Sequence, residues 1–175
     1  PTYRKSREAV QYVTTIDDPS YEPTNGKKYI FSTLDQRSLD IGIRTEWTMN
    51  ARLSMQLYLQ PFVASGDYHS FKFLTRGRDD EFTSLDQLQY EAGDNSYRAE
   101  SLEFGNPDFN FRSVRGSAVA RWEFRPGSAL YVVWNENRAD VVPIGDFRFR
   151  RDLRAIPNAP SHDVFLVKLS YWLPM

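Results

Sequence analysis

Apolar and polar residues alternate along residues 39–62, and this stretch sets the pattern for the rest of the chain. The apolar positions carry odd numbers: Leu39, Ile41, Ile43, Trp47, Met49, Leu53, Met55, Leu57 and Leu59. Successive side chains of a β-strand point to opposite faces, so the pattern predicts two long antiparallel strands that share one apolar face. The pattern is interrupted at 49–52, where we expect the turn. If the odd positions of both strands share a face, the numbers of facing residues add to an even total, which requires an odd loop length such as three residues.

A second hairpin follows the same rule at residues 114–134. Here the apolar positions carry even numbers: Val114, Ala118, Ala120, Trp122, Phe124, Leu130, Val132 and Trp134. Pro126 and Gly127 lie between the two halves, and Pro followed by Gly is typical of a turn. The same parity argument favours a three-residue loop at 126–128.

The remaining pattern predicts further strands and one helix. Strands are expected at 8–15, 28–34, 68–75, 97–104 and 163–173, with a short one near 88–91. A short helix is expected at 147–155, which Pro157 ends. With about seven to nine strands in all, we predict an all-β fold, either an antiparallel up-and-down barrel or a strongly curved sheet. We expect a flexible arm at 1–7 and a single antiparallel domain at 8–175, with a charged loop insert at about 76–94.

Composition narrows the classes of function. The chain has 175 residues, which suits one domain, and no cysteine, which excludes disulfides and thiolate chemistry. Its net charge of −1 provides no overall field to attract nucleic acid, so we expect no nucleic-acid partner. The aromatic content of 15% is high. Tyr and Trp suit surfaces that are half apolar and half wet, such as an interface or a membrane boundary.

Residues with catalytic or metal-binding chemistry are sparse. His69 and His162 are isolated, and a lone histidine is usually a surface or hydrogen-bonding group. Glu46 and Glu123 lie on the polar faces of the predicted hairpins and could form a carboxylate pair. Arginines on the same faces favour instead a ladder of cross-strand ion pairs along a wet face.

Acidic clusters in the predicted loops also give no recognisable site. Residues 17–18 and 79–81 carry carboxylates that could hold calcium, but neither segment has the ligand spacing of a known calcium loop. No phosphate loop, nucleophile elbow or dinucleotide fingerprint occurs. We therefore predict no catalytic residue, no metal site, no cofactor and no enzymatic activity.

Basic and aromatic residues are interleaved at 147–151. This run could in principle grip phosphates or stack bases, but it is short, and docking against a protein or a lipid headgroup is the favoured interpretation. The predicted partner-contact residues are Phe147, Arg148, Phe149, Arg150 and Arg151, together with Arg76 and Arg78. The predicted apolar strand face consists of Leu39, Ile41, Ile43, Trp47, Leu53, Met55, Leu57, Leu59, Trp122 and Trp134.

Four segments together resemble one protein family: residues 12–31, 57–68, 109–128 and 164–172. The blocks Gln60-Pro61-Phe62 and Arg125-Pro126-Gly127-Ser128 are the most specific of these. The chain resembles the C-terminal region of a large uncharacterised bacterial family that joins a carbohydrate-binding-like module to an outer-membrane-type β-barrel. The N-terminal module and most of the barrel strands are absent from these residues. The resemblance implies the strand pattern and brings no catalytic motif.

Three functions are compatible with this pattern. The first expectation is a non-enzymatic structural β protein of the bacterial cell envelope, either periplasmic or membrane-associated. As an accessory subunit, it would stabilise or clamp a larger protein assembly. Its partners would be other protein subunits, with membrane contact in addition. The second is an outer-membrane β-barrel pore or the C-terminal part of one, and the third is a small barrel that binds an apolar ligand. They differ in whether the apolar face meets a protein core, lipid or an enclosed ligand.

Overall fold

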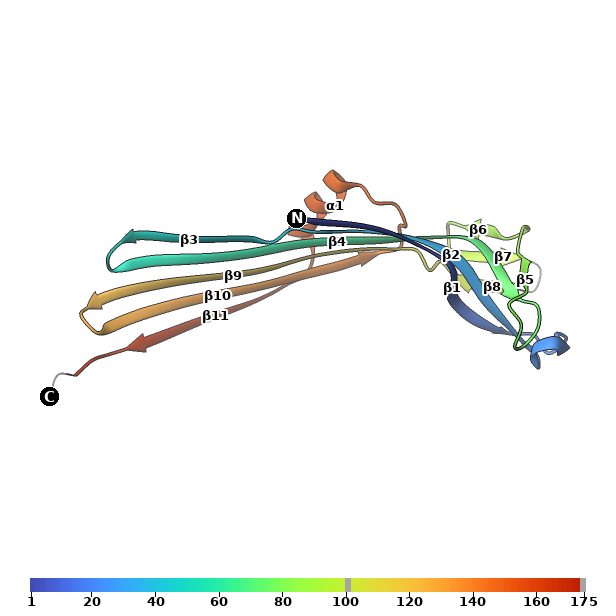
Figure 1. The fold of residues 1–175 in the computed structure, drawn as a ribbon, viewed down its shortest axis with the longest axis horizontal. Helices are drawn as coiled ribbons and strands as arrows, with labels where there is room; N and C mark the ends of the chain where they lie inside the picture. Colours follow the sequence, from blue (N-terminus) through green and yellow to red (C-terminus); the bar gives the residue numbers. More distant parts are fainter. Residues whose placement is uncertain (100–101, 174–175) are drawn as a thin grey trace.

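One long antiparallel sheet dominates the computed structural model, which describes residues 1–99 and 102–173 (Figure 1). Its strand order is β1-β2-β4-β9-β10-β11, and β3 and β5 also pair with β4. The strands are β1 (Thr2–Asp17), β2 (Lys27–Asp40), β3 (Ile43–Asn50), β4 (Leu53–Leu74), β5 (Phe82–Ser84), β9 (Phe109–Arg125), β10 (Ser128–Val142) and β11 (Ser161–Ser170). The predicted all-β class and strongly curved antiparallel sheet are confirmed. Within the described residues the sheet does not close into a barrel.

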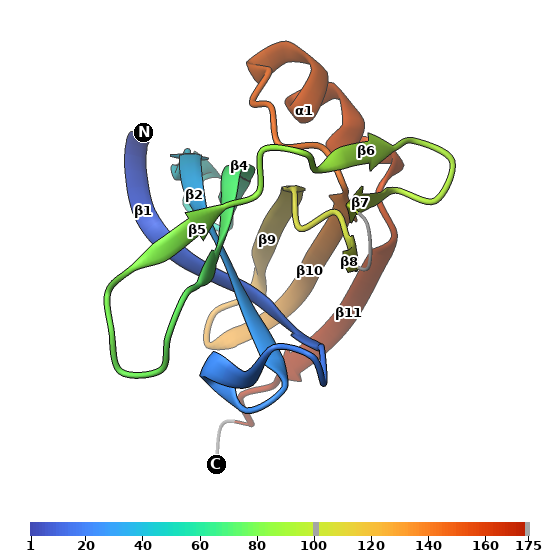
Figure 2. The ribbon, with the colours of Figure 1, turned by 90° about the vertical axis from the view of Figure 1, so that its right-hand side faces the viewer.

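The remaining elements are short. A second sheet consists of β6 (Gln89–Glu91), β7 (Ser96–Ala99) and β8 (Leu102–Gly105). Helix α1 (Phe149–Ala155) continues into the 3-10 helix η2 (Ile156–Asn158), and a further 3-10 helix, η1 (Glu22–Thr24), precedes β2. The predicted helix near 147–155 is therefore confirmed. Figure 2, viewed nearly along the strands, shows α1 standing off one side of the main sheet.

The two predicted hairpins form with the expected parity. Trp47 faces Met55, and Trp122 faces Leu130, so both registers add to even numbers. Each hairpin carries an irregularity beside its turn. In the second hairpin Gly127 has a positive φ of 75°, the conformation that completes a type I turn with a bulge. Alternation along both strands of each hairpin therefore sets which side chains share a face.

The N-terminal residues differ from the prediction of a flexible arm. Residues 2–7 belong to β1 and pair with residues 35–40 of β2. The Arg7 guanidinium donates two hydrogen bonds of 2.6 Å to the Asp35 carboxylate. The arm is ordered because β2 extends beyond its predicted end and offers an edge for it to pair with.

The strand predicted from Leu39 onward is interrupted at Ile41 and Gly42. Leu39 belongs to β2 and faces Val63, whereas β3 begins at Ile43. Ile41 still donates its backbone N–H to the carbonyl oxygen of Pro61, at 3.1 Å. β2 and β3 thus follow one another along the same edge of β4.

The charged insert is more ordered than a loop. We expected residues 76–94 to form a loop with one short strand. The segment contains two strands, β5 and β6. The single strand expected at 97–104 is a hairpin of β7 and β8, and residues 100–101 within it lie outside the described residues. These strands fold back over the end of the main sheet (Figure 1).

The two faces of the sheet carry separate cores at this end. Ile30, Phe71 and Phe104 form one core beneath β6–β8. Val63, Val114 and Ile156 form the other, beneath α1. The register places Ile30 and Val63 on opposite faces of the sheet, because Ile30 has an even number in β2 and Val63 faces odd-numbered Leu39. A bulge in β4 near Ser70, whose φ is 54°, brings the odd-numbered Phe73 opposite Ile30.

The absence of a side chain at Gly66 allows the ring of Phe109 to pack closely against the backbone of β4. A Cβ atom at Gly66 would lie 2.3 Å from Cε1 of Phe109 on the facing strand. We expect Gly66→Ala to lower the free energy of unfolding by about 1–3 kcal/mol, because the Phe109 ring must move out of a packed position. Denaturant unfolding measures this change.

Gly105→Ala is the matched control, since a Cβ atom there meets nothing within 4 Å. A Phe109→Ala background should remove most of the cost of Gly66→Ala. Equal destabilisation by the substitution in both backgrounds would contradict this explanation.

Candidate functional site: an apolar band across one face

Three rungs of apolar residues cross the main sheet between its hairpins and α1. A rung here means residues that face one another across neighbouring strands. The rungs on β4, β9, β10 and β11 are Leu53–Trp122–Leu130–Leu169, Met55–Ala120–Val132–Val167 and Leu57–Ala118–Trp134–Phe165. β3 adds Trp47 beside Met55 and Thr45 beside Leu57. We call these residues the apolar band; none of them is charged.

The apolar band is largely uncovered by the described chain. Phe165 is 73% exposed, Val167 67%, Trp47 60% and Trp122 51%. Soluble monomers rarely expose a large contiguous apolar patch, and such patches mark contact with a protein, a membrane or a ligand. The band is therefore the strongest candidate for a functional surface.

Polar residues and α1 bound the band on the side away from the hairpins. The next rung contains Ile43, Leu59, Gly116, Glu136 and Asp163, so it is apolar on β3 and β4 and carries two carboxylates on β10 and β11. The Trp134 indole N–H donates to the Asp163 carboxylate at 2.9 Å, and the Trp134 ring stacks on Phe165. Leu59 packs against the core beneath α1. The band thus ends where polar groups and the helix begin.

Aromatic side chains mark the hairpin end of the same face. The Trp122 and Phe124 rings lie 6.0 Å apart, and Phe124 stacks on Tyr171 at 6.5 Å. Arg125 donates a hydrogen bond to the Tyr171 hydroxyl. Apolar, aromatic and then charged groups follow one another toward the turn.

The opposite face carries a mixed, largely polar set of side chains, which we call the polar face. Its rungs are Ser54–Arg121–Tyr131–Lys168, Gln56–Val119–Val133–Leu166 and Tyr58–Ser117–Asn135–Val164. Arg121 pairs with Glu123 at 2.9 Å within one strand, rather than across strands. Glu46 faces Gln56 on another rung, so the two glutamates form no carboxylate pair.

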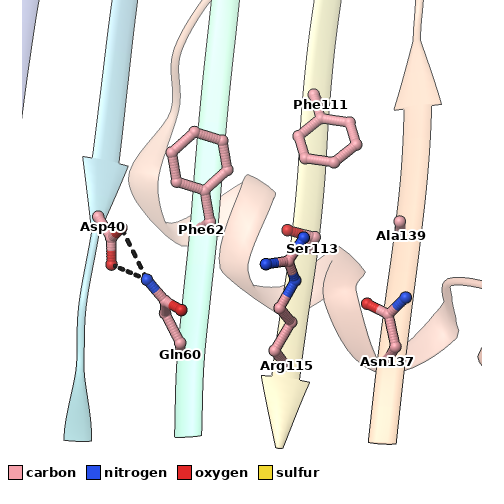
Figure 3. A pocket seen from close by; sticks show the side chains of 8 residues that line it. All are labelled: Asp40, Gln60, Phe62, Phe111, Ser113, Arg115, Asn137 and Ala139. Carbon is pink, nitrogen blue, oxygen red and sulfur yellow. Dashed lines mark hydrogen bonds between the residues drawn. The ribbon is translucent and has the colours of Figure 1, made fainter.

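A hollow of about 340 Å³ lies on the polar face (Figure 3). It is lined by Asp40, Gln60, Phe62, Phe111, Ser113, Arg115, Asn137 and Ala139. Gln60 donates from its side-chain amide to both carboxylate oxygens of Asp40, at 3.0 and 2.9 Å. Figure 3 shows these side chains on the near side of the sheet, with α1 behind it. The hollow is a polar extension of the sheet surface rather than an enclosed apolar cavity.

The predicted contact residues at 147–151 divide into an inner and an outer set. Phe147 packs against the core of Val63 and Val114 and lies edge-on to Tyr3. Arg151 donates to the carboxylates of Asp152 and Asp146 at 2.8 and 2.5 Å. These residues therefore stabilise the segment from within.

The outer set consists of three exposed residues. Phe149 and Arg150 are exposed, and so is Arg148, although its guanidinium also pairs with Asp146 at 2.7 Å. Burial would raise the pKa of Asp146, but the neighbouring Arg151 and Arg148 lower that pKa below its ordinary value. Asp146 is thus an ionised anchor for both arginines at neutral pH.

Arg76 and Arg78 are not brought together with this segment. They lie in the turn between β4 and β5, at the far end of the sheet from the hairpins (Figure 1). Arg76 pairs with Glu81 at 3.2 Å, and the backbone of Gly77 contacts Pro23 beside η1. The two predicted groups of contact residues therefore belong to different surfaces.

Neither histidine belongs to a reactive cluster. The His69 imidazole lies 3.3 Å from Asp35, which also binds Arg7, and Arg7 is the main cause of the lowered pKa of the Asp35 carboxyl. His162 is exposed on β11. In residues 1–99 and 102–173, no three His, Asp or Glu side chains gather in a way that could hold a metal ion. Over the same residues, no helix is long and apolar enough to cross a membrane.

Sequence reasoning missed the fully buried Asp152. Its carboxylate accepts a hydrogen bond from the backbone N–H of Arg148 at 2.8 Å and another from Arg151. The first contact satisfies a free donor at the start of α1, as in a helix cap. The four-residue spacing from Arg148 to Asp152 was the available signal.

The fold and the band define the class of this protein: a curved antiparallel sheet with one uncovered apolar face and one polar face. The chain belongs to a family described as a domain of unknown function, DUF5916, which matches residues 2–175. No curated protein and no solved structure matches the chain.

The buried carboxylate of Asp152 allows a test of how α1 is held. We expect Asp152→Ala to lower the local stability of residues 146–158 by about 2 kcal/mol, because it leaves the backbone N–H of Arg148 and the Nε–H of Arg151 without their acceptor. Hydrogen exchange measured by mass spectrometry should show faster exchange in this segment. Arg154→Ala, at an exposed position of the same helix, should leave the exchange unchanged. Unaltered exchange in Asp152→Ala would contradict the assigned role.

Proposed function

We propose that this chain forms part of the wall of a transmembrane β-barrel, with the apolar band facing lipid and the polar face directed toward an aqueous interior. This corresponds to the outer-membrane-type barrel that the sequence resemblance implies. The observation that carries the proposal is the band itself: uncharged, continuous over five strands and uncovered. In membrane barrels, apolar outward residues alternate in the same way with polar inward residues.

The length of the apolar segments supports the proposal. Between the hairpin turns and the core of Val63 and Val114 beneath α1, this face is uncharged on β4 from Leu53 to Pro61, on β9 from Gly116 to Phe124, and at the end of the chain from Phe165 to Leu173, whereas β10 carries Glu136 directly after Trp134. Each segment has nine residues. A tilted strand needs about 9–11 residues to cross the hydrocarbon core. The aromatic residues near both ends of the band match the aromatic girdles of such barrels.

The connections suggest an orientation in the membrane. The β3–β4 and β9–β10 turns are short and lie together at one end (Figure 1). The long connections, which carry β6–β8 and α1, leave from the other side of the band. In outer-membrane barrels the short turns are periplasmic and the longer loops extracellular. We therefore propose that α1 and β6–β8 are outside the cell.

The directions of the two edge strands determine whether a closed barrel would need an odd or an even number of further strands. At the level of the band the order is β3-β4-β9-β10-β11 and every pairing is antiparallel, so both edge strands, β3 and β11, run in the same direction. Closing the ring with antiparallel pairs alone requires an odd number of further strands. A second copy in the same orientation would meet this one through parallel edges, so identical copies do not complete an antiparallel ring.

The proposal differs from the expected accessory subunit in what covers the apolar band. A subunit that clamps a protein assembly would cover the band with protein, whereas a barrel wall would leave it in contact with acyl chains. Three of the four tryptophans, Trp47, Trp122 and Trp134, belong to the band. Tryptophan fluorescence therefore distinguishes the two functions directly.

We expect phospholipids brominated on their acyl chains to quench a single tryptophan on the apolar band but not one on the polar face. The first variant keeps Trp122 and replaces the other tryptophans with Phe. The matched variant replaces all four tryptophans with Phe and adds Tyr131→Trp. Tyr131 lies on the polar face, and it follows Leu130, the residue that faces Trp122. Both are measured in the full chain reconstituted into neutral phosphatidylcholine vesicles.

Quenching of Trp122 alone supports the wall proposal. Absence of quenching at both positions would mean that protein or water covers the band. Equal quenching at both positions would mean that neither face lines an aqueous interior, and either result would overturn the proposal.

A further inference from the structure

We propose that the exposed side of α1 binds the phosphate groups of lipid headgroups at the membrane surface. This inference rests on the proposed membrane function and identifies a lipid-binding site within it. The site comprises Arg148, Phe149, Arg150 and Arg154, and we call these residues the α1 arginine face. Its ligand is the phosphate of a membrane lipid rather than the acyl chain.

Helix α1 lies directly next to the apolar band. Helix α1 and η2 stand on the same face of the sheet as the apolar band, over Val63 and Val114. Leu59, which also packs against this core, belongs to the rung next to the last rung of the band. If the band meets hydrocarbon, the helix lies immediately beyond it, at the depth of the headgroups. Figure 1 shows α1 projecting from the sheet about midway along the long strands.

The α1 segment carries an excess of positive charge. Residues 146–154 contain four arginines and two aspartates, which leaves two positive charges in excess on a chain whose net charge is −1. The aspartates are engaged by Arg148 and Arg151. Arg150 and Arg154 are exposed and form no ion pair with any described residue. Guanidinium groups bind phosphate oxygens through paired N–H donors.

Contacts with the sheet hold the backbone of α1 and η2 in place. The Asp152 carboxylate ties the start of α1 to Arg151, and Ile156 anchors the end of the helix in the core. Arg138 on β10 donates to the carbonyl oxygen of Pro157 at 2.6 Å, so the strand itself holds η2. The exposed arginines therefore project from a fixed height above the band. Phe149, at 49% exposure, adds an apolar ring of the kind that helices at a membrane surface insert at the boundary of headgroups and acyl chains.

An acidic protein surface is the main alternative ligand, and the position of α1 argues against it. Headgroups lie at the border of a lipid-facing band by necessity, whereas an acidic protein surface would have to be supplied there by a particular partner. Nucleic acid is disfavoured because the surrounding chain has no net positive charge.

The test uses the full chain, transferred from detergent to vesicles of phosphatidylcholine with or without phosphatidylglycerol. An arginine near an anionic surface contributes a factor of about five to the partition constant. The double variant Arg150→Gln/Arg154→Gln should therefore lower partitioning onto phosphatidylglycerol vesicles by roughly 25-fold. Partitioning onto pure phosphatidylcholine should change far less, because the choline cation there offsets the charge of the phosphate. Flotation of vesicles with bound protein measures both constants.

Arg76→Gln/Arg78→Gln is the matched control, because it removes the same charge from the distant β4–β5 turn. A similar loss in both double variants would reflect overall charge and overturn the assignment of the site. No loss in Arg150→Gln/Arg154→Gln would overturn it as well. Selective competition by inorganic phosphate over sodium chloride at equal ionic strength would identify a free-phosphate site and overturn the lipid assignment.

The vesicle-partitioning test of the α1 arginine face and the quenching test of the wall proposal can fail independently. Quenching of Trp122 by brominated phosphatidylcholine requires no anionic lipid and reports on the apolar band alone. If Trp122 is quenched while the two arginines make no difference, only the lipid-phosphate inference fails. If Trp122 is not quenched, the wall proposal fails first.

Discussion

The hydrophobic effect favours burial of the apolar band on one face of this sheet, and the described chain leaves that band largely exposed. Backbone hydrogen bonds between neighbouring strands are internal to the sheet, so they do not require a partner on either face. The apolar band does require one, because each large apolar side chain that stays in water forgoes about 1.5–3 kcal/mol of burial free energy. Its covering must come from a membrane, a protein or a ligand, and that requirement leads to the functional proposals above.

The other half of the same sheet is covered on both faces by its own chain. The β6–β8 sheet covers the core of Ile30 and Phe71, and α1 covers Val63 on the opposite face. A bulge near Ser70 and the absence of a side chain at Gly66 make this packing sterically feasible. The rung that contains Leu59 and Glu136 therefore separates a part that folds around its own cores from a part that depends on its surroundings.

The alternating part of the fold is predictable from sequence, and the covering elements are not. Period-two alternation identifies Leu57 and Trp122 as residues of one face, and it fixes the parity of both hairpins. Ser70 and Phe71 give no local sign of a bulge, because a bulge depends on the facing strand. The order of residues 2–7 likewise depends on the distant edge of β2, which no local pattern contains.

The candidate surface shows the same division. The run of arginines and aromatic residues at 147–151 is visible in the sequence, but its separation into an inner and an outer set depends on where the sheet lies beneath it. Arg151 is engaged because Asp146 and Asp152 lie on its inner side, whereas Arg150 stays exposed. Sequence patterns therefore indicate which residues could form a surface, and tertiary packing decides which of them remain available.

The β10–β11 connection links the position of the helix to that of the band. β10 contributes Trp134 to the last rung of the band, Glu136 to the next rung, and Arg138 to the one after it. Arg138 binds both Glu136 and the carbonyl oxygen of Pro157, so the strand that ends the band also holds η2. A change in the depth of the band would therefore move α1 with it. This coupling follows from the antiparallel register, since a shift of one residue in β10 would turn Trp134 and Arg138 to the opposite face together.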